Sequence, residues 1–539
     1  MSQFASTTEL QSYHHDASQF HLTRPQSIHV RGESHSYPTI VSQELPVAND
    51  KTYEPIPTKR SVAIIFSIAM VTGVSSMLNG LTTVILPTLA KDLHLGTELQ
   101  IWPISVTALT CGCTLLLAGS ICDALGAKMM YLCGTVLQTA FVLGSGLSKN
   151  AFDIIMFRGL TGIAISFCLP SAVSIITSSF KGKQRNMAFA FLGSGQPVGF
   201  SIGLVLGGLL TEYVSWRVGF YIGAGIIGSN IALIVWAVPK GDAGELSWGM
   251  RRRRIVKDID WVGAALASVS LALSSYVFAA ITGSASSIKE PVNIALLSLS
   301  LVLAPVFITW VGRQENRGLP AIIPNSLWRN RYFTTVCLAV FLAWGSFNSL
   351  ETMLTFYFQD VQVLSPLQTS IRFLPAAVAG IIINLIAGAM VHRVSAHLLV
   401  NLGLFVTCAA PFLMTFAKPS SSYWTSGFLA NVLNPIGTDC LFTVANLLIT
   451  ANFPPKTQAL AGGVFNTVSQ VGKSVGVALT AVVASSVTTN SDFSNKSSPD
   501  ALMKGYNASF WYSFGICCVT FLVALVGLKD VGKVGHKRD

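Results

Sequence analysis

Residues 62–86 read VAIIFSIAMVTGVSSMLNGLTTVIL, an apolar run without a charged side chain. A helix needs about 20 such residues to cross the hydrocarbon core of a bilayer, so this run is long enough to span it. Comparable blocks recur as far as Leu528, and only 11% of the 539 residues are charged, against about 25% in an average soluble domain. The pattern indicates a polytopic membrane protein and excludes a large soluble domain.

The apolar blocks predict an all-α membrane protein with fourteen transmembrane helices. Residues 1–60 are polar and show no apolar periodicity, which is typical of a disordered tail. Residues 529–539 form a second, short tail. The predicted spans are 62–86, 100–119, 129–147, 151–179, 187–210, 218–238, 261–281, 292–311, 333–357, 371–391, 398–416, 425–449, 460–487 and 509–528.

The distribution of Lys and Arg predicts the orientation of these helices. With the first tail in the cytoplasm, 25 of the 35 basic residues lie on the cytoplasmic side, 7 outside and 3 within spans, as the positive-inside rule requires. The run Arg251–Arg254 then faces the cytoplasm, where its charges either keep the loop on that side of the membrane or bind anionic lipid headgroups. The net charge of +11 is spread over such short clusters, which argues against nucleic-acid binding. The sequon at Asn495 lies in the longest predicted external loop, 488–508, and is a candidate glycosylation site.

An internal repeat predicts the domain organisation. Gly119-Ser-Ile-Cys-Asp123 follows the second span, and Gly388-Ala-Met-Val-His392-Arg393 follows the tenth with the same spacing. Glycines recur in the fifth and thirteenth spans, so both matches are offset by eight spans. We therefore predict a six-helix half (61–238), a cytoplasmic loop with two inserted helices (239–311) and a second six-helix half (312–528). Two related halves with a site between them are typical of transporters.

Ionisable side chains within spans are functional candidates, because a charge in hydrocarbon is costly. Arg158 lies in the fourth span, Glu351 in the ninth and Asp439 in the twelfth. A buried carboxyl group can bind and release protons, since burial opposes its charged form and a nearby cation favours it. These three residues are candidates for proton coupling, and a permanent ion pair between helices is the alternative. Lys473 is either a structural counter-ion or a cavity residue.

Neutral groups in the spans are candidates for a cavity lining or for helix packing. Polar side chains either face a cavity or join helices through hydrogen bonds, and we single out Asn79, Gln196, Asn434 and Asn446. Aromatic residues of the ninth span face either substrate or lipid: Phe341, Trp344, Phe347 and Phe356. Glycines of the fifth span allow a second helix to approach closely: Gly195, Gly199, Gly203, Gly207 and Gly208.

The sequence predicts no metal site and no cofactor. The ten cysteines show no Cys-x-x-Cys spacing, and the histidines of the first tail are irregularly spaced. There is no P-loop for ATP and no nucleophile with a plausible base, so we expect neither an enzyme nor an ATP-driven pump.

Two motifs carry a resemblance to a known family. Gly119-Ser-Ile-Cys-Asp123-Ala-Leu-Gly126-Ala-Lys128 resembles the loop signature of the major facilitator superfamily, Gly-x-Leu-Ala-Asp-Arg-x-Gly-Arg-Lys. Arg158-Gly-Leu-Thr-Gly162 resembles the superfamily's span-four signature. The fifth span resembles the antiporter signature, with Leu204 in place of its proline. Together with fourteen spans, these motifs resemble the drug/proton antiporter branch, in particular fungal aminotriazole-resistance-type transporters.

The resemblance implies the major facilitator fold, in which spans one, four, nine and twelve line a central cavity. Asn79, Arg158, Glu351 and Asp439 would then surround one space. It also implies proton coupling for Arg158 and a gating loop that contains Gly119, Asp123, Gly126 and Lys128.

These observations predict a proton-coupled secondary active transporter that exports a small organic compound, such as a drug, toxin or secondary metabolite, by alternating access. An importer of a siderophore or amino acid and a non-transporting membrane receptor are the alternatives. We expect a monomer in the plasma membrane, with the vacuolar membrane as the second possibility. Its expected partners are the substrate, protons and the lipid bilayer.

Overall fold

The computed structural model describes residues 57–96, 99–180, 182–239, 249, 253, 256, 259–280, 289–390, 394–452 and 455–529. Within this part of the chain the regular structure is helical, and no strand occurs. The helices are α1 (Thr58–Asp92), α2 (Trp102–Leu125), α3 (Ala127–Leu147), α4 (Ala151–Ser179), α5 (Gly182–Tyr213), α6 (Trp216–Ala237), α8 (Trp261–Ala280), α9 (Pro291–Asn316), α10 (Asn325–Trp328), α11 (Arg331–Phe356), η3 (Tyr357–Val361), α12 (Pro366–Met390), α13 (Ala396–Met414), α14 (Gly427–Asn452), α15 (Pro455–Thr489) and α16 (Pro499–Gly527).

Thirteen described helices are long and apolar enough to cross a membrane. They correspond to the predicted spans except the seventh, where α8 offers a shorter apolar stretch, Trp261–Ser274. The protein is therefore an all-α, multi-pass membrane protein, as predicted. The fourteenth span stays a prediction.

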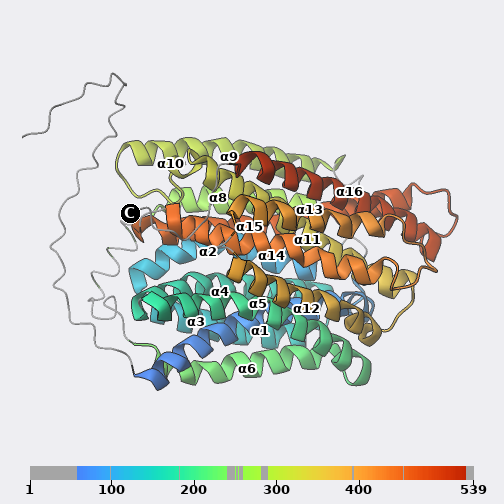
Figure 1. The fold of residues 1–539 in the computed structure, drawn as a ribbon, viewed down its shortest axis with the longest axis horizontal. Coiled ribbons are helices and arrows are strands. Elements are labelled where there is room, and N and C mark those ends of the chain that lie inside the picture. Colours follow the sequence, from blue (N-terminus) through green and yellow to red (C-terminus); the bar gives the residue numbers. More distant parts are fainter. Residues whose placement is uncertain are drawn as a thin grey trace, which may run out of the picture. The chain divides into compact units, whose positions relative to one another are not determined.

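Helices α1–α6, the N-terminal set, and helices α11–α16, the C-terminal set, pack in the same pattern (Figure 1). In the first set α1 contacts α5 and α6, α2 contacts α4, and α3 contacts α4 and α6. The second set repeats every one of these contacts between α11 and α16. The two sets meet where α2 packs against α15 and where α5 packs against α12. The repetition supports the predicted halves, whose boundaries stay a prediction.

Helices α8 and α9 form a separate pair at the junction of the two sets. They pack against each other, and α8 also contacts α2 and α15. Asp260 fixes the start of α8, because its Oδ1 accepts hydrogen bonds from the Gly263 backbone N–H (2.8 Å) and from the Trp310 indole (2.9 Å). Much of α9 remains uncovered, and Leu301 is 66% exposed. In a bilayer such a surface contacts lipid.

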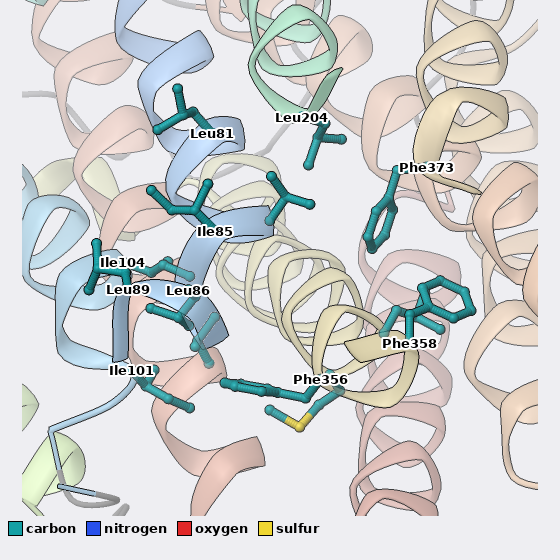
Figure 2. Close-up of a cluster of buried hydrophobic side chains, with 14 of the residues drawn as sticks. Leu81, Ile85, Leu86, Leu89, Ile101, Ile104, Leu204, Phe356, Phe358 and Phe373 are labelled. Carbon is teal, nitrogen blue, oxygen red and sulfur yellow. The ribbon is translucent and has the colours of Figure 1, made fainter. Parts of the chain in front are cut away.

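One end of the bundle is closed by an apolar cluster that both helix sets share (Figure 2). Gln359 Nε2 donates a hydrogen bond to the Val84 carbonyl, and Ser370 Oγ donates one to the Leu204 carbonyl, both at 2.6 Å. Under the predicted topology this end would face outside. Buried side chains from α1, α5, α11 and α12 meet in the cluster, among them Leu86, Leu204, Phe356 and Phe373.

The predicted loop 488–508 is wrong in its extent. Helix α15 continues to Thr489 and α16 begins at Pro499, so the connection covers only residues 490–498. The reason is a local start signal: the Ser498 side chain accepts a hydrogen bond from the Ala501 backbone N–H (3.3 Å), and proline is well suited to the first helical position. Asn495 remains exposed in the shortened loop.

The predicted loop between the second and third spans is also wrong. Helix α2 continues to Leu125 and α3 begins at Ala127, so Gly126 is the whole connection. Its φ of 96° lies in the region that favours glycine. Gly119 and Asp123 therefore lie within α2, and Lys128 lies in the first turn of α3.

Several sequence predictions lie outside the described residues. They include the tail 1–56, residues 391–393 of the internal repeat, the side chains of Asp123 and Asn446, and three arginines of the basic run, Arg251, Arg252 and Arg254.

The topology can be tested by labelling in intact cells, using a background in which the exposed native Cys133 is replaced by serine. We expect Asn495→Cys to react with an impermeant maleimide and Arg252→Cys to react only after permeabilisation, because the positive-inside rule puts them on opposite sides. The background protein is the control. Protection of position 495 together with labelling of position 252 would contradict the orientation.

Candidate functional site

A cavity that is partly open to solvent lies between the two helix sets. Helices α1, α2, α4 and α5 contribute to its wall from the N-terminal set, and α11, α14 and α15 from the C-terminal set. Of the predicted cavity residues, Asn79 and Gln196 line it. The full lining is Val71, Thr72, Ser75, Ser76, Asn79, Thr107, Ala108, Cys111, Ile165, Cys168, Leu169, Gln196, Trp344, Phe442, Asn466, Ser469 and Gln470.

Arg158 lies beside this cavity and is held by neutral oxygens. The side chain is 1% exposed in α4. Its Nε donates to the Pro103 carbonyl (3.0 Å), and its NH2 donates to Asn79 Oδ1 (2.9 Å). Thr107 Oγ1 donates to the Arg158 carbonyl (3.1 Å) and joins α2 to α4. No carboxylate of the described residues forms an ion pair with Arg158, so the structure links this charge to the cavity wall through Asn79.

Glu351 and Lys473 belong to a group of interacting buried charges. Glu351 is 4% exposed in α11, and its carboxylate interacts electrostatically with Lys473 of α15 and Asp439 of α14. Lys473 interacts in turn with Arg158 across the junction of the helix sets. The group contains two basic side chains, Arg158 and Lys473, and two acidic ones, Glu351 and Asp439. Any proton that binds one carboxylate changes the field at the other members.

Asp439 faces a neighbouring helix and is absent from the cavity wall. Its Oδ2 lies 3.2 Å from the position that a Cβ on Gly380 would take, and its carboxylate interacts with the side-chain amide of Asn384 on α12. Asn434, five residues earlier on α14, donates from Nδ2 to the Phe347 carbonyl of α11 (3.3 Å). The structure therefore brings Asn79 and Arg158 into contact, whereas Asp439 and Asn434 join α14 to its neighbours.

The glycine row of α5 lies directly against α1. A Cβ on Gly199 would approach the Gly73 carbonyl carbon to 2.7 Å, and one on Gly203 would approach the Met77 carbonyl carbon to 2.7 Å. Gly195 and Gly207 face the same helix, with nearest atoms in Ala69 and Val84. Gly208 faces α12 instead, where a Cβ would lie 2.8 Å from the Pro366 carbonyl oxygen. Helix α5 thus contacts α1 on one side and the C-terminal set on another.

The predicted gating residues lie where α2 and α3 join. Lys128 Nζ donates hydrogen bonds to the carbonyls of Val235 (2.9 Å) and Val238 (2.5 Å) at the end of α6. A cation at this position also interacts favourably with the helix dipole. These two bonds join α3 to α6 within the N-terminal set. A gating role for Gly119, Asp123, Gly126 and Lys128 stays a prediction.

Most polar residues of the cavity wall are absent from the sequence predictions. Helical spacing could have revealed them, because Thr72, Ser75, Ser76 and Asn79 recur at intervals that place them on one face of α1. Asn466, Ser469 and Gln470 form the equivalent stripe on α15. Among the aromatic residues of the ninth span, Trp344 lines the cavity, whereas Phe356 belongs to the closing cluster.

Comparison with known proteins identifies the family. The family model described as Major Facilitator Superfamily matches residues 68–477, and a second match covers 388–537. The chain belongs to this superfamily. It is 38% identical to MFS-type transporter 1 of Pyricularia oryzae, over 88% of this chain and 85% of that protein. It is 28% identical to the puromycin resistance protein pur8 of Streptomyces alboniger, over 82% of this chain and 86% of the relative.

A solved structure supports the same fold. The bacterial homologue of the human lysosomal transporter Spinster, in an inward-facing and occupied conformation, superimposes with a TM-score of 0.57 at 15% identity. The match covers 88% of this chain and 98% of that one. The family and the fold together make this protein a membrane transporter of the Major Facilitator Superfamily.

Proposed function

We propose that the protein is a proton-coupled secondary transporter of the fourteen-span drug/proton antiporter branch, and that it exports a small organic compound from the cytosol. The proposal rests on one observation: a cavity between two similarly packed helix sets lies beside buried ionisable side chains from both sets, among them Arg158 and Glu351. A site between related helix sets is what alternating access requires.

A mechanism follows from this arrangement. Protonation of Glu351 neutralises its carboxylate and removes the attraction between this group and Lys473. The resulting change in the electrostatic field also acts on Arg158, which is hydrogen-bonded to the cavity residue Asn79. Opening the closed end requires the bonds from Gln359 to Val84 and from Ser370 to Leu204 to break. Substrate release to the exterior and proton uptake would then occur in the same open conformation.

The direction of transport rests on relatives. One relative is named for resistance to puromycin, which fits export of a toxic compound. We place the transporter in the plasma membrane as a monomer. An importer would accumulate substrate in the cytosol, whereas the proposed exporter would remove it. The direction of flux therefore separates the two functions.

Proton coupling can be tested by exchanging the carboxyl groups for amides. Glu351→Gln is expected to abolish active accumulation while exchange of substrate across the membrane survives, because the amide keeps the size of the side chain and loses its titration. Asp439→Asn is the matched comparison, and we expect a smaller effect because that carboxylate lies against α12.

The measurement is flux into sealed vesicles with an imposed pH gradient, using a compound to which a deletion strain is hypersensitive. Wild-type flux that ignores the gradient would contradict proton antiport. If only Asp439→Asn uncouples transport from the gradient, the proton-binding carboxylate is Asp439 on α14 and not Glu351. Loss of both accumulation and exchange would indicate a folding or binding role.

A further inference from the structure

The cavity wall carries no formal charge. Its lining includes hydroxyl and carboxamide side chains from both helix sets and contains no Asp, Glu, Lys, Arg or His. The four buried ionisable side chains lie outside this lining, and one of them, Arg158, is hydrogen-bonded to the lining residue Asn79. A charged group in such a pocket would lose water without gaining a counter-ion, which is costly.

Several polar side chains of the cavity wall make no hydrogen bond within the described part of the protein. Across the described residues, the side chains of Thr72, Ser76, Gln196 and Gln470 take part in no hydrogen bond, although all four line the cavity. Neighbouring groups are already engaged: Ser75 Oγ accepts from Gln138 Nε2 (2.7 Å). Gln196 and Gln470 are partly buried, so water or a ligand can supply the hydrogen-bond partners of their carboxamides. Gln196 belongs to α5 and Gln470 to α15, so one ligand that bonds both would bridge the two helix sets.

The cavity wall also contains two aromatic side chains, Trp344 and Phe442. The rings of Trp344 and Phe442 are 5.4 Å apart at 37°, and Phe442 also lies 5.6 Å from Phe465. Both pairs are tilted, and aromatic rings accept a further planar ring in offset or edge-to-face geometry.

We propose that the transported compound is uncharged and combines a planar ring with hydroxyl or carbonyl groups. Its ring would pack on Trp344 and Phe442, and its polar groups would bond Gln196 and Gln470. This inference rests on the proposed function, because it names the substrate class of the same cavity.

The test uses a matched pair of fluorescent probes, 4-methylumbelliferyl β-D-glucoside and 4-methylumbelliferyl β-D-glucuronide. They share the coumarin ring and the pyranose scaffold and differ only at C6, where the glucuronide has a carboxylate in place of the hydroxymethyl group. Binding is measured by equilibrium dialysis on the full-length protein in nanodiscs, without a gradient. We expect the glucoside to bind at least about tenfold more tightly than the glucuronide, because a hydrogen-bonding wall without a counter-ion disfavours the charged member.

Variants then assign the contacts. Gln196→Leu and Gln470→Leu should each weaken glucoside binding by about threefold to tenfold, the loss typical of one neutral hydrogen bond. Trp344→Ala should weaken it further, and Trp344→Phe should retain most of it. Trp236→Ala is the control, because that tryptophan is 60% exposed on α6 and belongs to no part of the cavity wall.

Absence of glucoside binding, equal or tighter binding of the glucuronide, or unchanged affinity in both Gln variants would overturn the inference. Because the binding measurement needs no gradient, the glucoside can bind as expected even if flux does not depend on pH. In that case proton coupling is wrong and the proposed substrate class is retained. The opposite outcome, gradient-driven flux of a hypersensitivity compound without glucoside binding, leaves the proposed function intact and refutes the substrate class.

Discussion

Arg158→Ala is expected to reduce transport by at least about 100-fold in protein that reaches the membrane normally. Arg158 donates two hydrogen bonds from a fully buried guanidinium, to the Pro103 carbonyl and to Asn79. Hydrogen bonds to a charged group contribute about 1.5 to 3 kcal/mol each, and about 2.7 kcal/mol corresponds to a 100-fold change in rate. The measurement is initial flux in vesicles, normalised to transporter content.

Two further variants separate charge from geometry. Arg158→Lys keeps the positive charge but loses the planar guanidinium group with its several N–H donors, so it should retain only part of the activity. Asn79→Ala removes one of the two bonds and should have a smaller effect than Arg158→Ala. Wild-type flux in a correctly assembled Arg158→Ala protein would contradict a role for this residue in transport.

Gly203→Ala is expected to destabilise the folded protein strongly, by at least about 1 to 3 kcal/mol, the usual cost of overpacking a tight contact. A Cβ at this position would lie 2.7 Å from the Met77 carbonyl carbon and 2.9 Å from the Leu81 backbone nitrogen. These are backbone atoms of α1, so the clash can be relieved only if α1 and α5 separate. The measurement is thermal unfolding in detergent, with the yield of folded protein as a second readout.

The same helix supplies a matched control. Gly193 also lies in α5, and among the described residues no atom lies within 4 Å of the position its Cβ would take. Gly193→Ala should therefore be neutral or slightly stabilising, because alanine is the better helix former. Equal effects of the two substitutions would mean that the close approach of α1 and α5 contributes nothing to stability.

The sequence by itself determines the class of protein and the course of most helices. Span length and the absence of charge are local properties, because each transmembrane helix satisfies its backbone hydrogen bonds within its own segment. The same reasoning singles out Arg158 and Glu351, since a charge within an apolar run is costly wherever the run is placed. Helix ends are less well determined: Ser498 and Pro499 start α16 ten residues before the predicted span, in a segment that mixes polar and apolar residues.

Only the tertiary structure decides which side chains meet. Asn79 and Arg158 are 79 positions apart, and their bond depends on how α1 and α4 are rotated about their axes. The rotation of α1 also places the stripe of Thr72 and Ser76 on the cavity, and the rotation of α14 turns Asp439 toward Gly380 of α12. Helix periodicity defines the faces of each helix, but the neighbour of a face is set by packing among all the helices, in which small residues such as Gly203 allow the closest approaches.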